Sequence, residues 1–188
     1  MMKVGITGSL ASGKTTASKI LSAGRGPLFS ADAVVKKLYT KNSFKKDITK
    51  KLDLKNSLNI KKLLREKIKE NKSNILKLEK IIHPLVRKEM INFIRKNKKK
   101  KFVFLEIPLL IESNLTNIFD VIFYIKAKKS IRLKRFKLKG GKKSIFNILN
   151  SKQLSDVKKA KYCDHIIVNE KNIKILKKNL LDIFKRYE

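Results

Sequence analysis

The sequence has no tryptophan and a single cysteine, Cys163, among its 188 residues. One cysteine excludes an internal disulfide and any metal site built from several cysteines. We interpret Cys163 as a small buried filler in preference to a reactive thiol. This cysteine usage is typical of a reducing compartment, which predicts a cytoplasmic protein.

Long apolar runs are also missing. No charge-free stretch approaches the roughly 18 to 20 residues that span a bilayer. The start Met1-Met2-Lys3-Val4 lacks the longer apolar region of a secretory signal. We therefore expect no membrane partner and no export. With 188 residues, of which 42% are hydrophobic, the chain is long enough for one domain with its own core, and a monomer is favoured.

Acidic residues are scarce, because 15 Asp and Glu face 48 Lys and Arg, a formal net charge of +33. Such a balance raises the question of nucleic acid. The lysines are spread over every segment, however, and no surface that combines aromatic and basic residues stands out. We interpret the charge as lysine-rich composition on solvated faces, expect no specific nucleic acid partner, and note that a positive field attracts polyanions such as ATP.

Residues 8–15 read GSLASGKT, the G-x-x-x-x-G-K-[ST] pattern of a phosphate-binding loop. Glycine at both ends lets the backbone amides converge on phosphate oxygens, Lys14 reaches the β and γ phosphates, and the Thr15 hydroxyl binds Mg²⁺. A short apolar stretch precedes the loop and a helical stretch follows it. The pattern predicts ATP binding with Mg²⁺ through Gly8, Ala11, Ser12, Gly13, Lys14, Thr15 and Thr16.

Strand and helix patterns alternate along the chain, which predicts an α/β fold with a mainly parallel sheet covered on both faces. The five strand candidates are residues 3–7, 27–30, 102–106, 121–125 and 165–168. Residues 33–100 are longer than one crossover needs and read as a helical insertion. Because proline suits a first helical turn, Pro84 predicts a fresh helix over residues 85–96. The glycines in residues 139–143 indicate a hinge of a lid.

Asp32 follows the second strand candidate. Ligands of open α/β sheets bind beyond the carboxyl ends of the strands, so Asp32 can act as the general base that takes the proton of an attacking hydroxyl. The alternative is a helix N-cap for the residues from Ala33 onward. The residues alone leave both readings open.

Several segments resemble the dephospho-coenzyme A kinases, and they occur in the same order over nearly the whole chain. They are the loop of residues 8–15, Ser30-Ala31-Asp32, IIHPLV at residues 81–86, PLLIE at residues 108–112, LKR at residues 133–135 and DHIIVN at residues 164–169. The resemblance implies transfer of the ATP γ-phosphate to the ribose 3′-hydroxyl of dephospho-coenzyme A. It also implies a P-loop fold of three layers with a five-stranded sheet, a helical substrate-binding insertion and a small lid.

The resemblance also implies roles for individual residues. Asp32 is the base, and Arg135 in the lid clamps phosphate oxygens beside Lys14. Glu106 binds Mg²⁺ through water, together with Thr15. The implied substrate-binding residues are Asp32, Arg65, His83, Pro108 and Leu109. For His83 a structural role at a helix end is the alternative.

The implied organisation is a single kinase domain over residues 1–188. Residues 1–36 and 98–188 form its nucleotide-binding core, residues 37–97 the insertion, and residues 135–150 the lid. Three features depart from the family: Ser30 replaces the first aspartate of a D-x-D, Lys139 replaces a second lid arginine, and the glycine- and lysine-rich segment that follows replaces an acidic residue. Two alternative functions are another small-molecule kinase of this fold, acting on nucleosides or nucleotides, and a basic nucleotide-binding protein without transfer activity.

Overall fold

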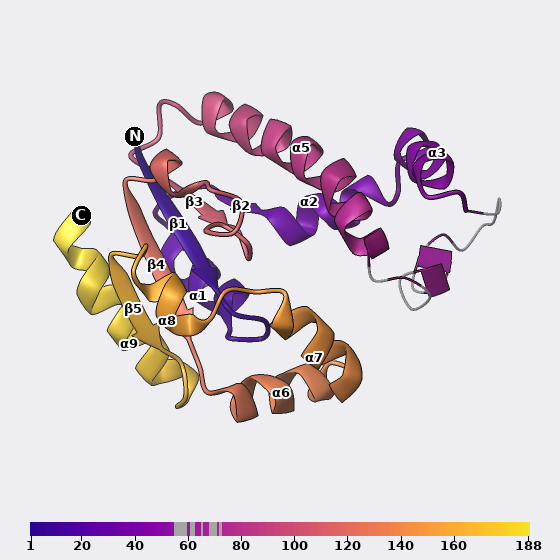
Figure 1. Ribbon diagram of the computed structural model, residues 1–188. Helices are drawn as coiled ribbons and strands as arrows, with labels where there is room; N and C mark the ends of the chain where they lie inside the picture. Colours follow the sequence, from indigo (N-terminus) through magenta and orange to yellow (C-terminus); the bar gives the residue numbers. More distant parts are fainter. Residues whose placement is uncertain (55–59, 61–62, 65, 68–70, 72) are drawn as a thin grey trace. The chain divides into compact units, whose positions relative to one another are not determined.

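The computed structural model in Figure 1 describes residues 1–54, 60, 63–64, 66–67, 71 and 73–188. The chain divides into two compact units, of which the larger comprises Met1–Ser30 with Asn97–Glu188 and the smaller comprises Ala31–Lys96. The sequence predicted a core and an insertion with boundaries after residues 36 and 97, which are close to the boundaries between these two units.

The larger unit is built on a five-stranded sheet with the order β2-β3-β1-β4-β5, in which every pair of neighbours is parallel (Figure 1). The predicted α/β fold with a five-stranded parallel sheet is therefore confirmed. The strands are β1 (Met2–Gly8), β2 (Leu28–Ser30), β3 (Phe102–Glu106), β4 (Val121–Lys126) and β5 (His165–Val168).

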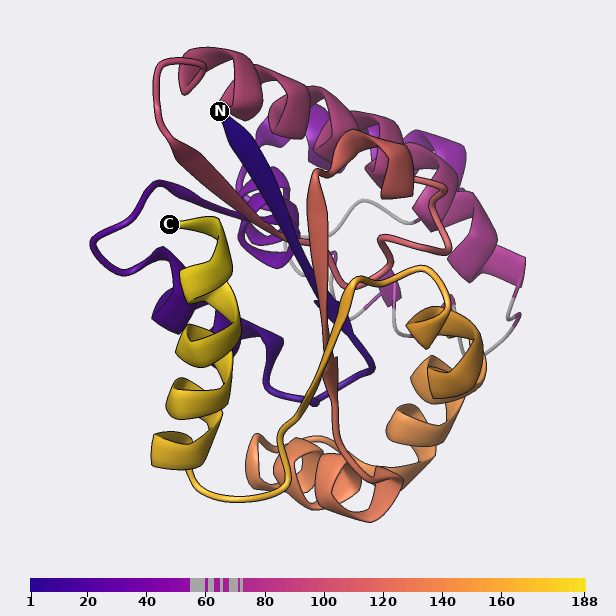
Figure 2. The ribbon, with the colours of Figure 1, turned by 90° about the vertical axis from the view of Figure 1, so that its left-hand side faces the viewer.

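Alternate side chains of the strands point to opposite faces, as the period of two requires. On one face, Val4 and Ile6 of β1 join the main core beneath α1 (Lys14–Ser22) and α9 (Ile173–Phe184), which lie side by side in Figure 2. On the other face a Cβ at Gly5 would lie 3.0 Å from the ring of Phe119. Glycine at this position lets residues 107–119 cover the sheet closely.

Two helices, α6 (Lys129–Leu138) and α7 (Lys143–Ser151), form a hairpin after β4. The turn between them is closed by hydrogen bonds from the Gly140 amide to Lys137 O at 2.9 Å and from the Gly141 amide to Phe136 O at 3.0 Å. Gly140 has a φ of +81°, and a Cβ at Gly141 would lie 2.1 Å from Phe136 Cε1. The turn that was predicted as a hinge thus favours glycine at both positions, Gly140 for its φ and Gly141 for the space that Phe136 takes.

Among the described residues, no helix is long and apolar enough to cross a membrane. The larger unit also contains three short elements. These elements are η1 (Thr116–Ile118), α8 (Asp156–Ala160) and η2 (Lys185–Tyr187).

The smaller unit contains α2 (Ala31–Leu38), α3 (Asn42–Lys51) and α5 (Ser73–Lys96). The predicted break at Pro84 is wrong, because α5 continues through this proline. Proline removes one backbone donor, but its fixed φ is compatible with a helix. The apolar side of α5, including Ile81 and Leu85, packs into the core of this unit and holds the helix together across the missing bond.

Candidate active site

The loop between β1 and α1 has the backbone of a phosphate cradle. Ala11 and Gly13 have φ values of +59° and +101°, a left-handed conformation that turns successive amides toward a common point. A Cβ at Gly8 would lie 2.4 Å from Ile125 O, and one at Gly13 would lie 2.2 Å from Asn169 Nδ2. A side chain at Gly8 would meet the backbone of β4, and one at Gly13 would be strained by the φ of +101°, so the loop favours glycine at both positions.

The position of the loop in the sheet is that of a ligand site. β1 and β3 are neighbours in the sheet. After β1 the chain continues to β2 at one edge of the sheet, and after β3 it continues in the opposite direction, to β4. Such a switch in direction opens a crevice at the carboxyl ends of the two strands. The N-terminus of α1 follows the loop directly, and its unpaired amides favour an anion there.

Lys14 supplies the fixed positive charge of the loop. The side chain is buried, and its Nζ donates a hydrogen bond to Ser9 O at 3.0 Å. The ammonium group therefore lies across the loop, from α1 back to the residue after β1.

A hydroxyl and a carboxylate meet beside the loop. Thr15 Oγ1 donates to Glu106 Oε1 at 2.6 Å, because Glu106 ends β3 in register with Ile6 of β1. Glu106 is buried, and its Oε2 has no hydrogen-bond partner among the described residues. Oxygen donors of this kind, with one buried carboxylate oxygen unpaired, fit a hard cation such as Mg²⁺.

The carbonyl of Ser12 receives two side-chain donors from later parts of the chain. Arg135 Nη1 of α6 donates to it at 3.3 Å and Asn169 Nδ2, directly after β5, at 2.8 Å. A second arginine of α6, Arg132, is buried and donates through Nη1 to Asn150 Oδ1 of α7 at 2.7 Å. The hairpin is thus tied both to the loop and within itself.

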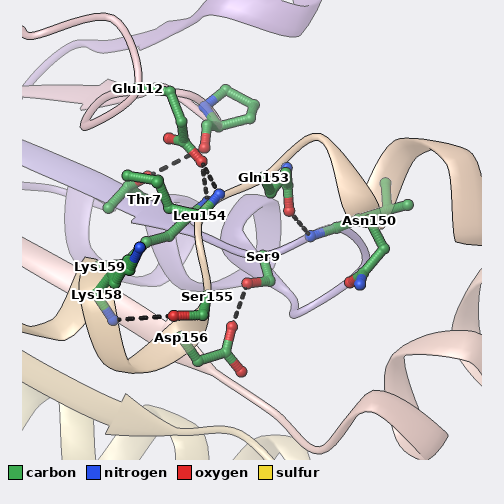
Figure 3. Close-up of polar contacts among 12 residues, drawn as sticks. Thr7, Ser9, Glu112, Asn150, Gln153, Leu154, Ser155, Asp156, Lys158 and Lys159 are labelled. Carbon is green, nitrogen blue, oxygen red and sulfur yellow. Dashed lines mark hydrogen bonds and ion pairs between the residues drawn. The ribbon is translucent and has the colours of Figure 1, made fainter.

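The outer side of the loop is held by residues 153–156, as Figure 3 shows. The Leu10 amide donates to Gln153 Oε1 at 2.9 Å. The Ser9 hydroxyl donates to Asp156 Oδ1 at 2.5 Å, and the Tyr124 hydroxyl donates to the same oxygen at 2.7 Å. We call Ser9, Tyr124 and Asp156 the loop brace.

An ion pair between the buried Lys159 and the half-buried Glu112 fixes α8 next to the brace. Lys159 is fully buried, and its Nζ lies 2.8 Å from Glu112 Oε1. The same carboxylate oxygen accepts the Leu154 amide at 3.1 Å (Figure 3). One carboxylate therefore anchors α8 and the residues leading into it.

The brace shifts the ionisation of its members. Burial is the main reason why the pKa of Tyr124 is well above its usual value. Burial alone would also raise the pKa of Asp156, but hydrogen bonds from Ser9 and Tyr124 and the positive charge of Arg132 hold it below its usual value. Asp156 is therefore a carboxylate, and Tyr124 a neutral donor, at neutral pH.

The larger unit brings together the residues of the loop, Glu106 and Arg135. In the same unit, Pro108 O accepts the Thr7 hydroxyl at 3.3 Å and Leu109 is half-buried.

Two other residues that were predicted from the sequence, Asp32 and His83, belong to the smaller unit. Asp32 is exposed in the first turn of α2, inside the helix and not at the capping position before it. His83 is exposed within α5, so the alternative of a histidine that ends a helix is wrong. Arg65 lies outside the described residues.

Sequence reasoning missed the loop brace, Arg132 as a link to α7, and the ion pair. Ser9 and Asp156 are 147 positions apart, and no local pattern joins them. The sequence offered only a general signal for the brace, the polar side chain of Ser9 inside the loop motif.

Comparisons with known proteins agree with this geometry. A family model described as Dephospho-CoA kinase matches residues 2–174. The dephospho-CoA kinase of Fusobacterium nucleatum is 33% identical over 100% of this chain and 96% of its own length. That of Rickettsia conorii is 33% identical over 100% and 98%.

Solved structures show the same fold. The dephospho-CoA kinase from Campylobacter jejuni has a TM-score of 0.70 and 25% identity, and the match covers 98% of this chain and 96% of that one. Shikimate kinase from Bacteroides thetaiotaomicron has a TM-score of 0.58 at 12% identity, covering 98% and 97%, a likeness of fold alone.

Proposed function

The chain belongs to the dephospho-CoA kinase family, and we propose that its loop of residues 8–15 binds the ATP whose γ-phosphate this kinase transfers to the ribose 3′-hydroxyl of dephospho-CoA. The observation that carries the proposal is the complete cradle, with left-handed Ala11 and Gly13, the α1 N-terminus and Lys14 in one place. The amides of Ala11, Ser12, Gly13, Lys14, Thr15 and Thr16 bind the phosphates.

In the proposed mechanism Lys14 moves its ammonium group from Ser9 O to the β and γ phosphates, where negative charge is redistributed in the transition state. Arg135 donates to the loop through one nitrogen and has further guanidinium donors for phosphate oxygens. Both positive charges stabilise the negative charge of the transition state, and both side chains already contact the loop before ATP binds.

The metal is proposed to be Mg²⁺. Thr15 Oγ1 would bind it directly, and Glu106, through its unpaired Oε2, would bind it directly or through water. Bound there, Mg²⁺ would neutralise phosphate charge. Among the described residues no group of three or more His, Cys, Asp or Glu side chains is arranged for a metal. A cation that shares its coordination among water, phosphate, one hydroxyl and one carboxylate suits these residues.

Asp32 is proposed as the base for the acceptor hydroxyl. It follows Ser30, the last residue of β2, by two positions, and Ser30 is in register with Glu106 of β3. Its carboxylate is exposed and can therefore be reached by an acceptor hydroxyl. Arg65, His83, Pro108 and Leu109 stay proposals for substrate binding.

The test is an assay of ADP release by the purified protein with ATP and Mg²⁺, offering dephospho-CoA, nucleosides or shikimate as acceptors. Turnover is expected with dephospho-CoA alone. Replacement of Asp32 by Asn should lower kcat by about 10²- to 10⁴-fold with ATP affinity kept, because a base that contributes this much is removed. Asp47→Asn, an exposed acid on α3, is the matched control. Equal turnover of the Asp32 and Asp47 variants would remove Asp32 from the mechanism.

The proposed location is the cytoplasm, where the ATP that the enzyme consumes is available. The monomeric state and the lack of a specific nucleic acid partner stay predictions from the sequence. So does a lid role for residues 135–150, which include parts of α6 and α7.

A further inference from the structure

The loop brace lies outside the chemistry proposed above. Asp156 Oδ1 accepts two hydroxyl donors, Ser9 from the loop and Tyr124 from β4. The hydroxyls of Ser9 and Tyr124 are themselves 3.1 Å apart. The two hydroxyls and the Asp156 carboxylate therefore all contact one another on the outer side of the loop, and the carboxylate carries the negative charge of this group.

We infer that Asp156 is a positioning residue for ATP binding, which acts through Ser9 to hold the phosphate-binding loop in its cradle shape. The inference depends on the proposed role of residues 8–15 as the ATP site. It assigns to α8 a part in ATP binding through the hydrogen bond from Ser9 to Asp156.

The first argument is where the bond attaches. Ser9 is the first residue after β1 and is buried, and its main-chain carbonyl accepts the Lys14 ammonium at 3.0 Å. Its side chain is bound to Asp156 on the other side. Ser9 is therefore held from two directions, and a loop that loses one of them samples more conformations before phosphate arrives.

The second argument is that Asp156 is itself held. The Tyr124 hydroxyl comes from a fully buried side chain of the central sheet. Three residues further along α8, Lys159 forms the buried pair with Glu112. A carboxylate fixed by a strand and by an ion pair can transmit their rigidity to the loop through one hydrogen bond.

The third argument is the sign of the charge. Asp156 is an anion next to a loop that binds a polyanion, so electrostatics alone makes its removal strengthen ATP binding. Positioning predicts the opposite effect, a weaker affinity on removal. The two explanations are thus separated by the direction of one measured change.

The experiment measures the Kd of ATP with Mg²⁺ by direct titration, without acceptor, and then KM for both substrates. Asp156→Ala should weaken ATP binding about tenfold, which is typical of losing a hydrogen bond to a charged group. KM for dephospho-CoA should stay unchanged. Asp156→Asn keeps an oxygen acceptor at the same place and should recover most of the affinity.

A double-mutant cycle with Ser9 tests the route. Ser9→Ala should weaken ATP binding nearly as much as Asp156→Ala, and the double variant should lose no more than Asp156→Ala alone, because both changes remove one bond. Asp182→Ala, an exposed acid on α9, is the matched control for charge and should bind ATP at least as tightly as the unmodified protein.

Two results would overturn the inference: an Asp156→Ala protein that binds ATP as tightly as Asp182→Ala, or losses for Ser9 and Asp156 that multiply. Circular dichroism identifies a variant that fails to fold. Ser9→Ala, which deletes one hydroxyl, then carries the test, with Ser22→Ala at the end of α1 as the control because the Ser22 hydroxyl donates to Lys19 O, away from the loop. ATP binding without any transfer to dephospho-CoA would refute the proposed function and leave this inference standing.

Discussion

Removing the carboxylate of Glu112 should be among the most damaging single changes in the larger unit. Lys159 is fully buried, and Glu112 Oε1 lies 2.8 Å from its Nζ. At an effective dielectric constant of about 20, opposite charges at this distance attract by about 6 kcal/mol. Deleting one partner leaves a buried charge uncompensated, at a cost of about 3 to 5 kcal/mol. Glu112→Leu also deprives the Leu154 amide of its acceptor.

Thermal unfolding followed by circular dichroism measures the effect. In a chain of this size each kcal/mol moves Tm by about 2 to 4 °C, so Glu112→Leu should lower Tm by roughly 10 °C. The double variant Glu112→Leu with Lys159→Met removes both charges and should recover most of the loss, since apolar replacements of buried pairs are often neutral. Lys128→Met breaks the exposed pair with Glu170, which is worth about 1 kcal/mol at most, so its Tm should change by about 4 °C at most.

The reasoning would be refuted by a Glu112→Leu protein whose Tm differs from that of the unmodified protein no more than the Lys128→Met control does. It would also be refuted by a double variant as unstable as the single one. The first result would mean that Lys159 reaches water, and the second that the cost comes from lost volume and not from charge.

Two further predictions concern single side chains. Gly141→Ala should lower the free energy of unfolding in urea by about 1 to 3 kcal/mol because its Cβ would meet Phe136 Cε1 at 2.1 Å, and by more than Gly140→Ala, which has no atom within 4 Å and only a φ of +81° to oppose it. Equal losses would contradict the steric argument. Burial raises the pKa of Cys163 from its usual 9.0 to about 12, so the reactive thiolate is scarcer in the folded protein at every pH below that value. Alkylation by iodoacetamide at pH 8 should be at least about a hundredfold slower in the folded than in the urea-unfolded chain, and comparable rates would show an open thiol.

The phosphate-binding loop could be predicted because all its information is local. A strand, eight residues with fixed glycines and a helix follow one another, and the cradle forms from these alone. The proximity of Thr15 and Glu106 could also be predicted, since neighbouring parallel strands end at the same edge of a sheet. The five strands could be located for the same reason, as apolar runs bounded by turn residues.

The errors and omissions come from contacts that sequence distance hides. Pro84 breaks helices by a local rule, and the apolar core of the smaller unit overrides that rule. From the sequence, Asp156 looks like an ordinary first-turn acid of a short helix, yet it accepts a hydrogen bond from a serine 147 positions away. Lys159 is one lysine among many in the sequence and is fully buried in the structure. The composition indicated that lysines lie on solvated faces, which is wrong for Lys159.

The central place of β1 in the sheet has a consequence for synthesis on the ribosome. β1 (Met2–Gly8) is made well before its partners β3 and β4, which begin at Phe102 and Val121. At about 5 to 20 residues per second, an apolar strand waits roughly 5 to 20 s before either partner exists. During this interval Val4 and Ile6 have no sheet to enter. The sheet can therefore form around β1 only after β3 and β4 have been synthesised.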